Sequence, residues 1–177
     1  MDHKGMMTFK KLVRAAIVGA GATAVMDLGG EVIRRATGVR PLNLDLVGRW
    51  VGHLRRGTLT HDSIVAAEPI ENERELGLAT HYAIGAGFVM ALAVVDSDWI
   101  DEPRLGSAMG LGLATCAAPW FLMQPAWGMG VAASRTPDPN TARRRTMRAH
   151  LLYGLGAYLM GKGCVGCGGT DLAVKTT

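Results

Sequence analysis

The sequence predicts an all-α, polytopic membrane helix bundle with about four transmembrane helices and a short interfacial helix. The main observation is a run of thirty residues, Leu105–Ser134, that contains no Asp, Glu, Lys, Arg or His. An uncharged, mostly apolar run of about 18 residues or more is typical of a membrane span. The chain also has 24 glycines, many of them inside apolar runs. Glycine weakens soluble helices but lets membrane helices approach closely, so this excess favours a membrane bundle.

The apolar runs define one membrane domain over residues 1–161. The expected spans are residues 12–30, 76–95, 105–133 and 149–161. The fourth span is short, because its 13 residues reach only about 20 Å of a hydrocarbon core roughly 30 Å thick. Residues 162–177 form a tail with glycines and cysteines, which we expect to be disordered.

The third span contains residues that disfavour a straight helix. Thirty helical residues would measure about 45 Å, half again the thickness of the core. Pro119 and Pro125 lie inside the run, and each removes a backbone donor. We therefore expect a straight helix to about Ala118, then a kinked or partly unwound segment from Pro119 to Gly130.

The loops differ in charge, which bears on orientation. Residues 34–75 contain seven arginines and residues 135–148 contain five, whereas Asp96–Arg104 has one arginine and four acids. With four spans the two arginine-rich loops share a side, and the positive-inside rule predicts that this side is cytoplasmic. The basic N-terminal segment then faces outward, against the rule; its cations are Lys4, Lys10, Lys11 and Arg14.

Within the first loop, apolar residues recur at helical spacing between Leu42 and Leu54. This pattern predicts a short amphipathic helix in the membrane interface, with Trp50 as its anchor. A soluble cap packed on the spans is the alternative.

Several motifs are typical of other proteins but lack the context that they need. Gly19–Ala24 matches a dinucleotide-binding turn, and Asp45 follows at roughly the sequence spacing of the acidic residue that binds the ribose. However, no alternating strands and helices follow. Ala22-Thr-Ala24 resembles a signal-peptide cleavage site, but the apolar core before it is short and broken by glycine. Cys164 and Cys167 supply at most half of a zinc site. The net charge of +4 comes from basic residues beside the spans, so we expect no nucleic-acid partner and no cofactor.

Ionisable residues inside spans normally face the bundle interior or a water-filled cavity. Asp27 is the clearest case, on a helix face that it shares with Gly19 and Thr23. The pattern His81-x-x-x-Gly85-x-Gly87 recurs as His150-x-x-x-Gly154-x-Gly156. Each histidine is therefore expected to face a neighbouring helix. The repetition suggests an internal duplication of a two-span unit, with coincidence in a glycine-rich chain as the alternative.

These residues form the expected functional cluster, on the side of the arginine-rich loops. It consists of Asp27, His81, Gln124, Arg135 and His150, with Arg49, His53, His61 and Asp62 as secondary candidates. The cluster either pairs the helices or handles a substrate, ligand or proton, since histidine titrates near neutral pH. Metal or haem ligation would need two of these histidines at one depth, and an adjacent His-Asp pair on a loop does not supply a hydrolase triad. We expect no catalytic, metal-binding or cofactor-binding residue.

Longer stretches of the chain match a known family. They are Gly21–Asp27, Val47–His53 with Arg56-Gly57, His61–Ile64, Leu76-Gly77 with His81–Gly85, Pro119–Pro125, Gly128–Pro139, and His150 with Tyr153–Leu159. In these stretches the chain resembles the domain-of-unknown-function 2938 family of small bacterial integral membrane proteins. The resemblance covers about residues 14–160. It implies a multi-pass inner-membrane protein whose first span is retained, and it carries over no activity or catalytic residue. Family members would continue an apolar last span where this chain has Lys162–Gly169.

The expected function is that of an integral membrane protein of unknown activity. It would be a small transporter, a channel or a proton-linked protein with a polar site within the membrane. A non-catalytic membrane scaffold or partner subunit is the alternative, and a membrane-bound enzyme is the third. The expected partners are the lipid bilayer and either a second copy of the chain or a membrane partner protein.

Overall fold

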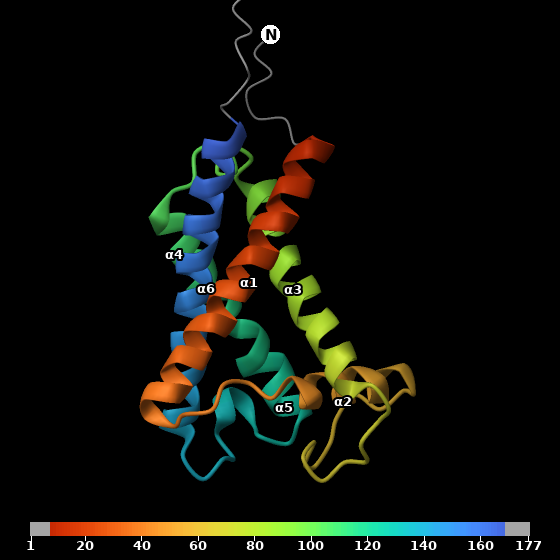
Figure 1. Cartoon of the computed structure of the whole chain (residues 1–177). Coiled ribbons are helices and arrows are strands. Elements are labelled where there is room, and N and C mark those ends of the chain that lie inside the picture. Colours follow the sequence, from red (N-terminus) through yellow and green to blue (C-terminus); the bar gives the residue numbers. More distant parts are fainter. Residues whose placement is uncertain (1–7, 169–177) are drawn as a thin grey trace, which may run out of the picture.

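The computed structural model describes residues 8–168, and every regular element among them is helical. Three helical segments there are long and apolar enough to cross a membrane. They are α1 (Phe9–Thr37), α3 (Glu73–Val95) and the segment Leu105–Ala126, which begins with α4 (Leu105–Thr115). A fourth long helix, α6 (Pro139–Gly168), runs beside them (Figure 1). The predicted all-α bundle is confirmed.

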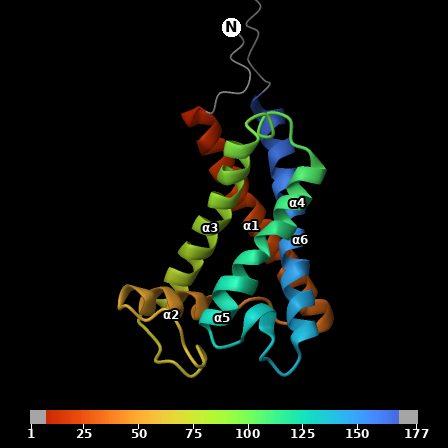
Figure 2. The same cartoon turned by 180° about the vertical axis from the view of Figure 1, so that it is seen from behind.

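The helices are arranged in the order α3, α1, α6, α4. The helix α1 packs closely against both α3 and α6, and α6 packs in turn against α4. In contrast, α3 and α4 hardly touch. Figure 2 shows the two separating toward the end of the bundle where α2 (Leu44–Arg55) lies. The bundle is therefore closed along the α1–α6 contact and open between α3 and α4.

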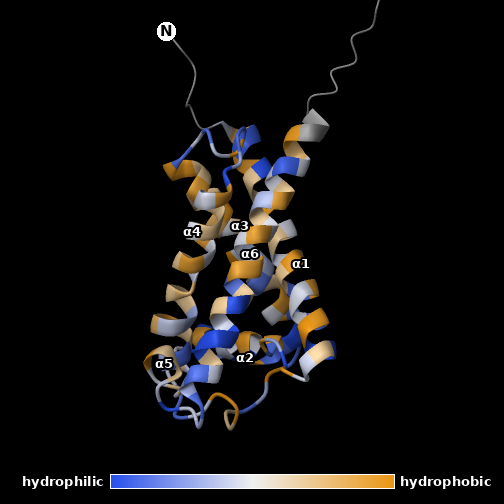
Figure 3. Ribbon diagram, turned by 90° about the vertical axis from the view of Figure 1, so that its left-hand side faces the viewer, coloured by the Kyte–Doolittle hydropathy of each residue, from blue (hydrophilic) through white to orange (hydrophobic). Residues whose placement is uncertain are grey.

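The side chains are distributed as expected for helices that face lipid. Large apolar residues lie on the outside, including Ile17, Leu28 and Val94, which are 55%, 68% and 64% exposed. Small residues such as Ala22 and Ala157 are buried between the helices. Hydrophobic residues extend along the outer surfaces of the long helices, and hydrophilic residues gather near the two ends (Figure 3). This pattern indicates a membrane protein.

The third span breaks within the predicted segment. The helix α4 ends at Thr115, and a π-helical turn follows at Ala118–Met123 (η1), before the short helix α5 (Gln124–Ala126). Pro119 has no N–H and cannot donate the usual bond to the Thr115 carbonyl. Within the turn, the Gln124 amide donates to the Pro119 carbonyl, five residues back, which is the π-helical pattern. The regular α-helix is thus lost near the predicted position, but residues 118–126 stay helical through a π turn, and only the part from Trp127 to Gly130 leaves the helix.

The chain turns back after α5. Gly128 and Gly130 have φ values of 82° and 73°, which glycine adopts without steric cost. A 3₁₀ turn, η2 (Val131–Ala133), then leads toward α6. The third span therefore ends near residue 126 instead of residue 133.

The fourth span lies in a longer helix than predicted. The helix α6 begins at Pro139 and continues to Gly168, so residues 162–168 extend the helix where we expected a disordered tail. Residues 169–177 lie outside the described part of the chain. Among residues 8–168, α6 is long enough for a span but does not belong to the three segments that are also sufficiently apolar.

The predicted amphipathic helix is present as α2, which lies across one end of the bundle (Figure 1). A Cβ atom on Gly48 would lie 1.6 Å from the Glu73 carbonyl oxygen, so α2 rests directly on the start of α3. Trp50 is only 7% exposed and donates a hydrogen bond to the Leu59 carbonyl at 2.9 Å. The expectation that Trp50 anchors α2 in lipid is therefore wrong, because protein covers the indole.

Ion pairs at the other end join the basic N-terminal segment to the acidic loop 96–104. Lys11 and Arg14 pair with Asp101 at 2.8 and 2.9 Å. Burial tends to raise the pKa of Asp101, but hydrogen bonds and charge from the two cations outweigh burial and hold that pKa below its usual range. These ion pairs hold the basic N-terminal segment to the acidic loop 96–104 in the folded protein. We still expect the two arginine-rich loops to determine orientation, because they contain more Lys and Arg residues than the N-terminal segment.

This orientation can be tested by labelling single cysteines in intact cells with a membrane-impermeant thiol reagent. In a Cys164→Ser, Cys167→Ser background, we expect Asp98→Cys to be labelled and Asn140→Cys to be labelled only after the cells are opened. Both positions are exposed, and the remaining Cys116 is buried. The reverse pattern would show that the arginine-rich loops face outward.

Candidate functional site

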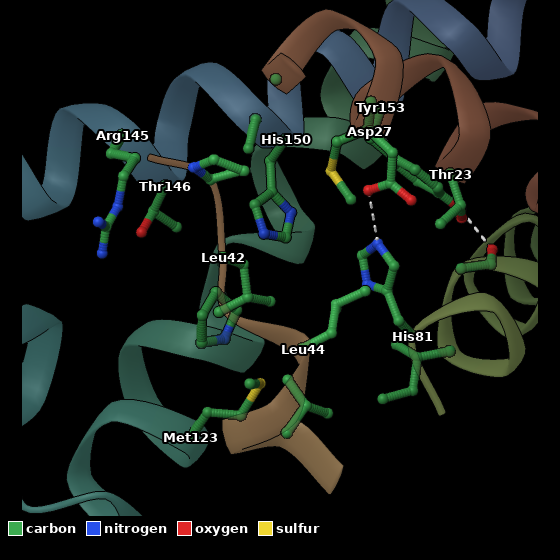
Figure 4. Close-up of a pocket in the computed structure, with 18 of the residues that line it drawn as sticks. Thr23, Asp27, Leu42, Leu44, His81, Met123, Arg145, Thr146, His150 and Tyr153 are labelled. Carbon is green, nitrogen blue, oxygen red and sulfur yellow. Dashed lines mark hydrogen bonds and ion pairs between the residues drawn. The ribbon is translucent and has the colours of Figure 1, made fainter. Parts of the chain in front are cut away.

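A glycine contact between α1 and α3 positions the first predicted histidine. A Cβ atom on Gly85 would lie 1.9 Å from Thr23 Oγ1, and one on Gly19 would lie 2.5 Å from the Gly85 carbonyl oxygen. The two backbones therefore touch at a point where no larger residue fits. His81, one turn before Gly85, faces α1, and its Nε2 lies 3.0 Å from Asp27 Oδ1 (Figure 4).

A second contact of the same kind joins α4 and α6. A Cβ atom on Gly112 would lie 2.4 Å from the His150 carbonyl oxygen, and one on Gly154 would lie 2.7 Å from the Ala108 carbonyl oxygen. The Nδ1 atom of His150 lies 2.8 Å from Thr115 Oγ1. In both halves of the chain, therefore, a histidine one turn before a contact glycine is held by a polar side chain of the partner helix.

The two histidines line one cavity of about 530 Å³ between the helices. This volume lies within the range of roughly 300–1,000 Å³ that is typical of ligand pockets. Its polar lining includes Thr23, Asp27, His81, Thr115, Gln124 and His150, and much of the remaining wall is apolar. Figure 4 shows His150 from α6 and the Asp27–His81 pair from α1 and α3 around the same space, with Leu42, Leu44 and Met123 nearby.

Tyr153 connects the two sides of the cavity. It is 2% exposed, and its hydroxyl donates to the Gly85 carbonyl. The bond joins α6 to α3, which have α1 between them in the helix order. Tyr153 and Thr115 were not among the predicted site residues. The sequence gives little indication of either residue, because a single tyrosine in a family motif or a single threonine in an apolar run can equally be an ordinary packing residue.

The structure brings together four of the five residues of the predicted cluster: Asp27, His81, Gln124 and His150 all line the cavity. Arg135 does not. It is exposed, and its backbone N–H donates to the Met129 carbonyl. The turn at Gly128 and Gly130 carries Arg135 past the end of the third span, so its position in the sequence did not indicate its position in space.

Among the secondary candidates, Arg49 joins α2 to α3. Its guanidinium forms two hydrogen bonds of 3.0 Å with the Glu73 carboxylate and also donates to the carbonyls of Ile64, Val65 and Ala67. The bonds to Glu73 raise the pKa of Arg49 above its usual value, although burial opposes this shift. Arg49 is therefore a fixed cation that holds the loop after α2 in place.

The remaining secondary candidates belong to that loop. His53 Nδ1 and His61 Nε2 are 2.8 Å apart, and the two rings stack. The His61 amide donates to the Ala126 carbonyl, which ties the loop to α5. Asp62 is exposed. These residues attach the loop to the end of the bundle and do not line the cavity.

We found no three His, Cys, Asp or Glu side chains placed to hold one metal ion within residues 8–168. His81 and His150 share the cavity but are bonded to different residues. The Ser63 hydroxyl oxygen accepts a hydrogen bond from the Ala66 amide within its own turn. The predicted residues contribute a carboxylate, two imidazoles and an amide to the cavity. Further polar residues of its lining are Glu31, Arg74, Arg145 and Arg148, and much of the remaining wall is apolar.

These features define a class of protein: a helical bundle with membrane-length helices around a central polar site. A family model described as "Protein of unknown function (DUF2938)" matches residues 16–164, and the chain belongs to this family. No curated protein and no solved structure matches the chain.

The helix contact at Gly85 leads to a prediction. Gly85→Ala should destabilise the bundle by about 1–3 kcal/mol, because the new methyl group collides with Thr23. Gly87→Ala is the matched control, since its Cβ atom meets no atom within 4 Å. Thermal unfolding of the purified protein in detergent measures both effects. Equal melting temperatures for the two variants would contradict the contact.

A second prediction concerns Arg49. Arg49→Gln should cost about 3 kcal/mol or more, because it leaves the Glu73 carboxylate unpaired at a site where the two side chains are only 11% and 18% exposed. Arg74→Gln removes an ion pair whose side chains are 73% and 37% exposed, and it should have little effect. Limited proteolysis within residues 56–72 would report release of the loop. Equal protection in both variants would show that Arg49 does not anchor it.

Proposed function

We propose that this protein is a small multi-pass transporter of the cell membrane that binds a solute in the central cavity and couples its movement to a proton. The observation that carries the proposal is the placement of Asp27, His81 and His150 around one cavity of about 530 Å³. Ionisable residues within a membrane bundle are costly, and they are kept where they serve a pathway or a proton relay.

The Asp27–His81 pair supports the proton-linked part. The Nε2 atom of His81 and the Oδ1 atom of Asp27 are 3.0 Å apart, so a proton can pass between the imidazole and the carboxylate. A change in protonation would alter the contact between α1 and α3 at the cavity wall. His150, bonded to Thr115, provides a second imidazole on the opposite wall.

The broken third span supports the solute-binding part. Transporters commonly form their sites where a membrane helix is interrupted, because free backbone groups and side chains can then face the substrate. Here the π-helical turn η1 replaces regular α-helix within the third span, and Gln124, the first residue of α5, lines the cavity. The sparse contact between α3 and α4 leaves room for one half to move against the other.

The alternative is a non-catalytic membrane scaffold or partner subunit. One observation favours it: each cavity histidine is already bonded to a side chain of a neighbouring helix. Such bonds are also what purely structural helix pairing requires.

Asp27→Asn, His81→Gln and His150→Gln separate the two functions. A deletion strain is first grown across a panel of solutes and pH values to find a condition that needs the protein. If the protein is a transporter, the variants insert and purify normally but fail to restore growth. Asp98→Asn removes an acid far from the cavity and should restore growth fully.

Two outcomes would contradict transport. Variants that insert and restore growth at every pH would show that the polar groups are dispensable. Variants that all fail to insert would show that these groups hold the helices together, as the scaffold alternative requires. Membrane-fraction blots and melting temperatures distinguish the two.

A further inference from the structure

We propose that the cavity binds an amphiphile whose head group is anionic and bears hydroxyl groups, with its hydrocarbon chain leaving between α3 and α4. The inference rests on the proposed function, since it names the class of ligand for the same cavity. It is carried by two unpaired arginines, two buried unpaired polar atoms and an apolar wall that reaches the outer surface.

The charge of the head group follows from Arg145 and Arg148. Both are half-buried residues of α6 that line the cavity. Three other arginines at this end have acidic partners: Arg35 pairs with Glu31, Arg49 with Glu73 and Arg74 with Asp45. Within residues 8–168, no carboxylate forms an ion pair with Arg145 or Arg148. The two carboxylates of the cavity wall, Asp27 and Glu31, are already paired with His81 and with Arg34 and Arg35. An anionic occupant would give Arg145 and Arg148 the partner that the wall does not, because guanidinium groups bind phosphates and carboxylates well.

The hydroxyl groups follow from Gln124 and Trp127. These residues are 8% and 5% exposed and line the cavity, and within residues 8–168 the Gln124 Oε1 and Trp127 Nε1 atoms have no hydrogen-bond partner. One is an acceptor and the other a donor, and buried polar atoms are normally satisfied. A hydroxyl group can both donate to the amide oxygen and accept from the indole N–H. A head group that carries hydroxyls beside its charge therefore fits both atoms.

The hydrocarbon chain follows from the side walls. Leu78 and Ile84 on α3 and Leu122 on η1 line the cavity, yet they are 46%, 44% and 54% exposed. The cavity wall thus continues to the outer surface on both sides of the gap between α3 and α4, where the two helices hardly touch. In a bilayer this surface meets acyl chains. A small soluble anion would use the arginines but would leave these apolar walls without a partner.

The test measures binding to the purified, delipidated full chain in a neutral detergent. The probes are dioctanoyl phosphatidylglycerol, dioctanoyl phosphatidylcholine and glycerol phosphate. The first has the anionic, hydroxylated head and the chains, the second has a zwitterionic head, and the third lacks the chains. Native mass spectrometry and thermal shift report binding. We expect phosphatidylglycerol to bind at least tenfold more tightly than either of the other two.

Variants locate the site. The double variant Arg145→Gln, Arg148→Gln should lose at least tenfold in affinity for phosphatidylglycerol, and Gln124→Leu should weaken binding several-fold. Arg144→Gln is the matched control, because Arg144 lies on the same helix but is exposed and does not line the cavity. Melting temperatures without lipid confirm that each variant is folded. If a variant does not fold, the unaltered protein is used instead. Brominated phosphatidylglycerol should then quench its tryptophan fluorescence, and of the three probes only phosphatidylglycerol should reverse the quenching.

Three outcomes would overturn the inference: equal binding of the two lipids, glycerol phosphate binding as tightly as phosphatidylglycerol, or an equal loss in the control and the double variant. Lipid binding is measured at equilibrium on the purified protein, so its result does not depend on whether the protein transports a solute. Lipid binding without any effect of Asp27→Asn on growth would refute the proposed function alone. Loss of growth in Asp27→Asn without lipid binding would refute only this inference.

Discussion

The rest of this structure depends on close backbone contact between helices at four glycines. Gly19 meets Gly85 between α1 and α3, and Gly112 meets Gly154 between α4 and α6. Each missing Cβ atom lets two helices approach to a distance at which short polar side chains can bridge them. The bonds of His81 to Asp27 and of His150 to Thr115 need this proximity. Because these four glycines have no side chain, the helices approach closely there, and this close approach determines how the cavity walls are arranged.

The two halves of the bundle use the same kind of contact but are joined unequally. The contact of α1 with α6 is close, and a Cβ atom on Gly156 would lie 3.0 Å from the Ala22 Cα atom. The corresponding contact of α3 with α4 is almost absent. If the half formed by α1 and α3 and the half formed by α4 and α6 were related by two-fold symmetry, these two contacts would be equally close. The difference leaves the cavity with one sealed side and one open side.

The sequence predicted much of this architecture, because membrane-length apolar runs and the proline-rich break depend on local composition. It also brought Asp27, His81, Gln124 and His150 to one site, since residues at helical spacing share a face. It failed where position depends on contacts distant in the sequence. Arg135 is carried away by a glycine turn, and Trp50 is covered by a loop that Arg49 anchors to Glu73. Tyr153 acts across α1 on Gly85, and no local pattern encodes that pairing.

The ion pairs between α1 and the loop 96–104 have a consequence for biogenesis. Lys11 and Arg14 are synthesised well before Asp101, their partner in the folded protein. In the orientation that we expect, the N-terminus crosses the membrane, and its cations would be uncompensated while α1 enters the bilayer. Only when the hairpin of α3 and α4 brings the acidic loop to the same side are these charges paired. Insertion of this chain is thus expected to be completed late, with the final orientation of the first helix secured by a loop made afterwards.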